Sequence, residues 1–272
     1  MSNQWDSIGR GFCENLFGGY PEIINYVTSF AMLIIGILGL FRSDLKPYVM
    51  KIIYTDFIVN WFGSFFLHYN GYKFYGNIDT VSMLCVSWSI TYIVFDGLFS
   101  CISSTRIKEF VDDFVCLFTR VFLIMSIASV TVDGKPYGIN FGFVEAFAVP
   151  NGLSILGMIV LLILTWKKLE CKLYVYFGLG LFLMTITVVI WGATEPYCKE
   201  LSDSEGKSDF LRISHGLWHI FFPLGAHYFT QVVLYVRYVV QEKNIFLVTS
   251  DNSCLKCVEY IIPVVSSDEN GL

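Results

Sequence analysis

The strongest constraint on the fold is a succession of apolar segments along the chain. Seven runs of roughly 18–25 residues follow one another, and about 20 apolar residues are enough for a helix to cross a bilayer. Only 15% of the residues are charged, against roughly a quarter in a typical soluble domain. The sequence therefore predicts an all-α, polytopic membrane protein built as a bundle of seven transmembrane helices.

These helices are expected to form one membrane domain, residues 1–238, followed by a short cytoplasmic tail, residues 239–272. We expect the helices at about residues 23–41, 49–69, 78–100, 114–131, 142–166, 173–194 and 213–238. The first residues lack a basic start followed by an apolar core, so we expect no cleavable signal peptide and targeting by the first helix. The net charge of −5 is mild and gives no reason to expect a nucleic acid as a partner.

Lysine and arginine residues in the short loops predict the orientation, because they accumulate on the cytoplasmic side. Most of them lie after the first, third and fifth helices and at the start of the tail. The loop before the last helix, on the opposite side, mixes its basic residues with many acidic ones. We therefore expect the C-terminus in the cytoplasm and the N-terminus in a lumenal or extracellular space.

Two of the four histidines, His215 and His219, stand four residues apart near the start of the last helix. Residues at this spacing share one face of a helix, so both imidazoles can reach a single metal ion. The rest of this helix is apolar, and polar groups within a membrane are costly unless they have a function. The pair is thus a candidate metal site.

The predicted topology brings other polar residues to the same depth. His68 ends the second helix and Asp79 begins the third, so both fall at the non-cytoplasmic end of the bundle together with the histidine pair. Three neutral imidazoles leave a fourth tetrahedral position open for water, which is typical of a catalytic zinc site. Gly216 stands where a zinc-protease helix carries its glutamate, so Asp79 is the candidate base. Ser64, one helical turn before His68, could donate a hydrogen bond to an oxyanion or to the attacking water.

Each residue also has a simpler interpretation. A histidine pair can form hydrogen bonds between helices, a serine can serve helix packing, and an aspartate can cap a helix N-terminus. His227, two turns beyond the pair, is expected to be a hydrogen-bonded residue of the bundle. Asp56, Asp96 and Arg120 lie nearer the cytoplasmic end, where they could form an ion pair or Arg120 could extend to the interface.

The combined pattern resembles the alkaline ceramidases, which belong to the CREST group of seven-helix membrane hydrolases. That group carries S-x3-H on the second helix, an aspartate on the third and H-x3-H on the last, and the resemblance covers essentially the whole chain. It implies that His68, His215 and His219 bind zinc, while Asp79 handles the proton and Ser64 assists. It also implies a lipid substrate, ceramide, whose amide is split into sphingosine and a fatty acid.

The family's N-terminal calcium-binding stretch is matched only in part. Glu14, Asn15 and Glu22 remain as oxygen ligands of the kind that calcium prefers. The family's aspartate is missing, its tryptophan is replaced by Phe12, and the segment is shorter. The resemblance implies a calcium site here, and a solvated acidic segment is the other interpretation. Thr80 stands where the family more often has glutamate, a change that removes no expected ligand.

Cys13 matches the cysteine of the family's N-terminal motif. Cys198 is expected on the same non-cytoplasmic side, where disulfides persist, so we expect a disulfide between the two.

The expected function is that of a zinc-dependent intramembrane amidase acting on ceramide, in the endoplasmic reticulum or the Golgi apparatus. Two other functions stay open. The chain could hydrolyse another lipid ester or amide, or it could be a seven-helix receptor or transporter with a structural zinc ion.

Overall fold

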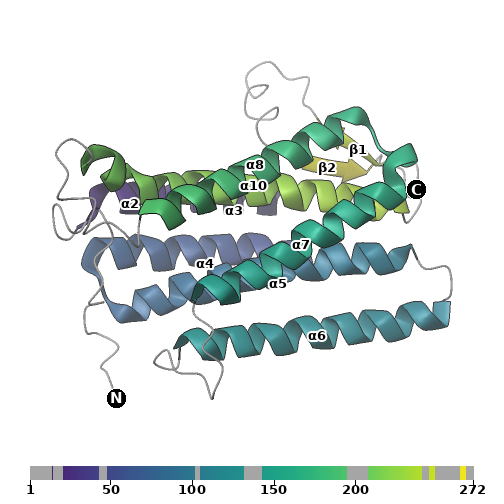
Figure 1. The fold of residues 1–272 in the computed structure, drawn as a ribbon, viewed down its shortest axis with the longest axis horizontal. Helices are drawn as coiled ribbons and strands as arrows, with labels where there is room; N and C mark the ends of the chain where they lie inside the picture. Colours follow the sequence, from purple (N-terminus) through teal and green to yellow (C-terminus); the bar gives the residue numbers. More distant parts are fainter. Residues whose placement is uncertain are drawn as a thin grey trace.

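Helices run side by side along the length of the molecule (Figure 1). This computed structural model describes residues 14, 21–42, 48–101, 105–131, 143–194, 208–240, 245–248 and 264–267. Its α-helices beyond residue 20 are α2 (Ile23–Thr28), α3 (Phe30–Arg42), α4 (Tyr48–Asn70), α5 (Lys73–Ser100), α6 (Thr105–Thr131), α7 (Phe143–Thr165), α8 (Cys171–Thr194) and α10 (Ser208–Val240). A short 3-10 helix, η1 (Trp166–Lys168), follows α7, and α2 with α3 forms one span that is interrupted at Ser29.

Four segments of the described chain are long and apolar enough to cross a membrane. They are Ile23–Phe41, Lys73–Ser100, Ala146–Thr165 and Cys171–Thr194. Large apolar side chains also cover the outside of the bundle; Ile163 on α7 is 64% exposed and Phe182 on α8 is 61% exposed. Water would oppose such a surface, whereas hydrocarbon solvates it. The protein is an all-α, polytopic membrane protein, as the sequence predicted; that all seven helical segments cross the bilayer stays a prediction.

Two helices occupy the centre of the bundle. The last helix, α10, packs against α2, α3, α5, α7 and α8. Its neighbour α5 contacts α4, α6, α7 and α10, while α6 lies at one edge of the molecule (Figure 1). Any residue that needs contacts from several helices is therefore best placed on α5 or α10, or on the face of α4 that meets them.

Three helices begin five or more residues earlier than the apolar pattern indicated. α5 begins at residue 73, α6 at 105 and α10 at 208, where the sequence predicted 78, 114 and 213. The apolar pattern marks only the part of a helix that lies in hydrocarbon, and polar turns beyond it form the same backbone hydrogen bonds. The extension of α5 changes one interpretation, because Asp79 lies inside the helix and Tyr72 is the residue at the N-cap position.

The tail contains a small β-element that was not predicted from the sequence. Strand β1 (Ile245–Val248) pairs antiparallel with β2 (Val264–Ser267), with Ile245 opposite Ser267. This pair packs against α10. Strands of four residues are too short to show a clear alternation of apolar and polar side chains, which is the usual sequence signal.

Candidate metal centre

Three buried histidines from two helices meet at one end of the bundle. His68 lies in the last turn of α4, while His215 and His219 lie one turn apart on α10. One ligand nitrogen from each residue can be chosen so that all three lie within 4.8 Å of one another. The ring centroid of His68 is 5.0 Å from that of each partner, and the two partners are 4.7 Å apart. The predicted convergence of these three residues is present, and the cluster could hold a metal ion.

Two glycines help to position the backbone segments that carry these rings. Gly71 adopts a φ of 72°, a conformation that favours glycine, and its N–H donates to the carbonyl of Leu67 at 2.7 Å, so that α4 ends at Asn70, shortly after His68. The backbone N–H of Glu22 then donates to the carbonyl of His68 at 2.9 Å. On α10, a Cβ atom at Gly216 would lie 2.9 Å from the side chain of Ile24. Glycine is needed here because α2 packs closely against α10.

Two of the rings are oriented by oxygen acceptors on the N-terminal side of the chain. His68 Nδ1 lies 2.5 Å from Glu22 Oε2, which also accepts a hydrogen bond from the Asn25 amide at 3.0 Å. His219 Nδ1 lies 2.9 Å from the backbone carbonyl of Asn25. A carboxylate and a carbonyl can only accept, so Nδ1 carries the proton in both rings and Nε2 is the nitrogen that can bind a metal.

This arrangement tests whether the residues fit a metal ion. Histidines that bind metals usually donate their other ring N–H to a carboxylate or a backbone carbonyl, and His68 and His219 do so here. A set of three neutral imidazoles suits zinc and leaves a further coordination position open. The residues therefore fit zinc in both the ligand atoms and the groups behind them.

Asp79 approaches the same end of the bundle from α5. Asn60 on α4 donates from its amide nitrogen to Asp79 Oδ1 at 2.7 Å and to the Asp79 carbonyl at 2.9 Å. The cluster of possible metal ligands found in the described chain contains the three histidines and no carboxylate. Asp79 is thus held beside α4 by a polar side chain, and the role of a helix cap is excluded because α5 begins at Lys73.

Ser64 completes a polar stripe on α4. Asn60, Ser64 and His68 follow one another at intervals of four residues, so they share one face of α4, which contacts Asp79 on α5 and the histidines on α10. The hydroxyl of the buried Ser64 lies 3.2 Å from His219 Nε2. Asn60 was not predicted from the sequence, although it precedes Ser64 by the same four-residue interval by which Ser64 precedes His68.

The expected calcium ligands are only partly within the described chain. The two carboxylate oxygens of Glu14 accept the backbone N–H groups of Ile24 and Asn25, both at 2.9 Å, and so satisfy the first turn of α2. Glu22 is fully buried against His68. Asn15 lies outside the described residues, and the calcium site stays a prediction.

The expected disulfide also lies outside the described part of the chain, because neither Cys13 nor Cys198 belongs to it. That bond stays a prediction as well. His227, by contrast, is a hydrogen-bonded bundle residue as expected: its Nδ1 lies 2.9 Å from the hydroxyl of Tyr54, which also accepts a hydrogen bond from Gln231 at 2.6 Å.

Comparison with known proteins agrees with the pattern of these residues. No curated protein matches the chain. A sequence model of the family described as Ceramidase matches residues 11–258, a range that contains the histidine cluster, Asp79 and Ser64. Because this match covers most of the chain, the chain belongs to the ceramidase family.

Proposed function

We propose that the protein is a zinc-dependent intramembrane amidase that hydrolyses the N-acyl bond of ceramide to sphingosine and a fatty acid. One observation carries the proposal: three buried histidines converge at the end of the bundle where Asn60 holds Asp79. Membership of the ceramidase family supports a hydrolase that acts on an amide bond of a lipid. The donor set supports zinc as the metal.

In this proposal His68, His215 and His219 hold the metal. A zinc ion bound there supplies Lewis-acid activation of the carbonyl and of the attacking water. Glu22 and the carbonyl of Asn25 keep the rings of His68 and His219 in the orientation that presents Nε2 to the centre. Such supporting acceptors commonly change metal affinity by about 10- to 100-fold.

Asp79 is the proposed base and acid. The oxygen of a water molecule bonds to the carbonyl carbon of the amide, and the Asp79 carboxylate accepts the proton that this water loses. The same carboxyl group then returns the proton to the amide nitrogen as the carbon–nitrogen bond breaks, so that a neutral amine leaves. Asn60 fixes the position of Asp79 through Oδ1, and the Ser64 hydroxyl is the proposed donor to the oxyanion that forms on the carbonyl oxygen.

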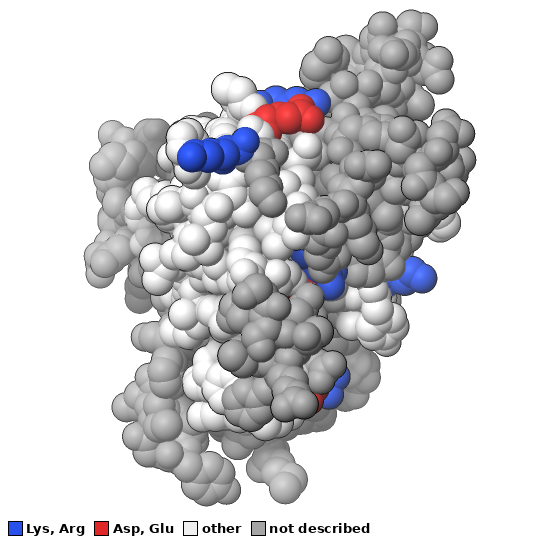
Figure 2. All heavy atoms as spheres, turned by 90° about the vertical axis from the view of Figure 1, so that its right-hand side faces the viewer, with Lys and Arg blue, Asp and Glu red and all other residues white. Residues whose placement is uncertain are grey.

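The surroundings of the centre support a lipid substrate and a membrane location. The outer surface of the helices is apolar, so hydrocarbon surrounds the bundle that contains the centre. A lipid substrate can therefore approach from within the bilayer. Figure 2 shows basic side chains at the opposite end of the bundle, which supports a cytoplasmic location for that end and a lumenal location for the histidines. We propose the endoplasmic reticulum or the Golgi apparatus as the organelle.

The test is turnover of a panel of labelled lipids by the purified full-length protein in detergent. The panel contains ceramide, a lipid ester and another N-acyl lipid. Release of sphingosine from ceramide, lost on treatment with a chelator and restored by zinc, is the expected result. Turnover of the ester alone would favour another lipid hydrolase, and no turnover by zinc-loaded protein would favour a receptor or transporter.

A further inference from the structure

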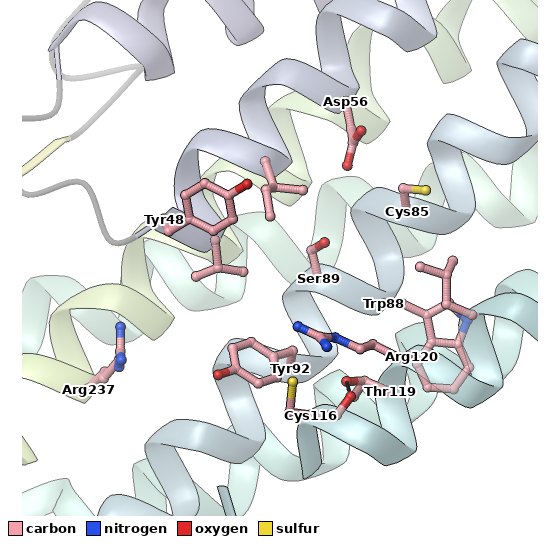
Figure 3. Close-up of a pocket in the computed structure, with 13 residues that line it drawn as sticks. Tyr48, Asp56, Cys85, Trp88, Ser89, Tyr92, Cys116, Thr119, Arg120 and Arg237 are labelled. Atoms are coloured by element: carbon pink, nitrogen blue, oxygen red, sulfur yellow. Dashed lines mark hydrogen bonds between the residues drawn. The ribbon is translucent and has the colours of Figure 1, made fainter. Parts of the chain in front are cut away.

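A second polar site lies away from the histidines, in a pocket of about 480 Å³ lined by α4, α5 and α6 together with the end of α10 (Figure 3). Asp56 lines this pocket and precedes His68 on α4 by twelve residues, which corresponds to roughly 18 Å along a helix. The pocket therefore belongs to the other half of the bundle. It shares no residue with the proposed active site.

Two opposite charges face this pocket without forming an ion pair. Asp56 enters from α4, and the guanidinium group of Arg120 points from α6 towards Ser89 and Tyr92 (Figure 3). Within the described chain, Oδ2 of Asp56 is buried and accepts no hydrogen bond. The other arginine of the pocket, Arg237, is engaged with Asp96 at 2.5 Å. Asp96 thus pairs with Arg237 rather than with Arg120, and the extension of the exposed Arg120 to the interface stays a prediction.

The buried oxygen of Asp56 is costly to leave without a partner, whereas the exposed Arg120 can meet a ligand at the mouth of the pocket. A charge inside a membrane protein normally pairs with a partner, faces a cavity, or marks the path of a substrate or ion. Asp56 and Arg120 together contribute no net charge to the pocket. A ligand with a single charge would satisfy one of them and leave the other without a partner. A ligand that carries both an ammonium and an anionic group would satisfy both.

The rest of the pocket suits an amphiphile. Apolar side chains of Val49, Ile52 and Leu123 line it beside the polar groups. The side that holds Tyr48 and Arg120 is open, and Tyr48 is 79% exposed. A lipid could therefore place its head group between the charges and leave its chain against the apolar lining and the bilayer.

We propose that this pocket binds a zwitterionic lipid whose head group carries an ammonium and a phosphate. The ammonium donates hydrogen bonds to the Asp56 carboxylate, and the phosphate accepts them from the Arg120 guanidinium. Hydrogen bonds between two charged groups are among the stronger ones, and the phosphate can take two from one guanidinium. The ligand is bound and is not transformed.

Native mass spectrometry of the full-length protein in a neutral maltoside detergent tests this proposal. Four probes with the same hydrocarbon chain are added separately: a lysophosphatidylethanolamine, a lysophosphatidic acid, a primary alkylamine and a monoacylglycerol. The wild-type protein should retain the lysophosphatidylethanolamine about ten-fold more strongly than each of the other three, a difference that corresponds to about 1.4 kcal/mol.

The variants should change the preference in opposite ways. Arg120→Gln should lose the preference for a phosphate and keep that for an amine, whereas Asp56→Asn should lose the preference for an amine and keep that for a phosphate. Arg120→Lys should restore part of the binding, because it keeps the charge. Lys51→Gln on α4 and Asp113→Asn on α6 remove exposed charges outside the pocket and should leave the preference unchanged.

Several results would overturn the proposal. Equal retention of the four probes by the wild-type protein would mean that the pocket is only a water-filled gap. Retention of both phosphate probes alike, lost only in Arg120→Gln, would indicate a simple anion site. A preference for the lysophosphatidylethanolamine over the alkylamine that survives in Arg120→Gln would place the lipid elsewhere, and this comparison decides the matter even if Asp56→Asn does not fold.

Discussion

Replacing Gly63 by alanine should damage catalysis while leaving the three histidines in place. Gly63 lies on α4 beside Ser64, at the point where α4 meets the beginning of α5. A Cβ atom at this position would lie 2.5 Å from the backbone nitrogen of Asp79, 2.9 Å from its Cα and 3.0 Å from the carbonyl carbon of Ile78. All three neighbours are backbone atoms, so no side chain can rotate away to make room.

The size of the effect follows from these distances. Ordinary contacts of a Cβ atom begin at 3.4 Å, so the backbone at Asp79 must move by about 0.9 Å relative to α4. A displacement of about 1 Å in a catalytic group can cost on the order of 100-fold in rate, or roughly 2.7 kcal/mol in the activation barrier. Overpacking should also cost about 1–3 kcal/mol of stability, partly offset by the better helix propensity of alanine.

The assay combines ceramide turnover with zinc content of the same preparation. Gly63→Ala should lose about 100-fold in kcat/KM and keep its zinc, because α5, the helix that must move, carries none of the three histidines. The matched control is Gly178→Ala on α8, where an added Cβ meets nothing within 4 Å. Wild-type kcat/KM in Gly63→Ala would refute the role of the α4–α5 contact in positioning Asp79. Loss of zinc with the activity would refute the separation of Asp79 from the metal ligands.

Further predictions concern the metal and its support. Alanine at His68, His215 or His219 should remove zinc and activity together, while Asp79→Asn should lose activity and keep most of the metal. Metal analysis of the purified variants measures this. Near-stoichiometric zinc in the double variant His215→Ala, His219→Ala would contradict the site. Glu22→Gln, which weakens the acceptor for His68 Nδ1, should lower zinc affinity by about 10- to 100-fold in a chelator competition without calcium, and an unchanged affinity would show that this contact does not support the metal. Mass mapping without reduction should recover Cys13 and Cys198 in one disulfide-linked peptide pair. Recovery of both as alkylated thiols would exclude that bond.

The sequence was most informative where one helix or the topology alone decides which residues meet. His215 and His219 share a face through their spacing, and His68 reaches them because alternating helices return to the same side of the membrane. The contacts that support these residues depend on tertiary packing, which no spacing reveals. Glu22 approaches His68 from a different helix end, and Asn60 reaches across to Asp79.

The charges in the other half of the bundle show the same limit. The sequence placed Asp56, Asp96 and Arg120 near one depth, but rotation about each helix axis decides which charges meet. Only the packed structure pairs Asp96 with Arg237 and leaves Arg120 beside the pocket.

The short helix α2 links the region before the first long helix to the proposed metal centre. The Glu14 carboxylate accepts hydrogen bonds from two backbone amides at the start of α2. Within α2, the carbonyl of Asn25 orients His219. Glu22, the residue before α2, orients His68. α2 continues into α3 through Ser29, and its other end is held by Glu14 and by the packing of Ile24 and Thr28 around Gly216. A binding partner or a cleavage that displaced the segment around Glu14 would therefore alter metal affinity without touching a ligand. Residues far from the histidines in sequence could thus regulate the enzyme through this short helix.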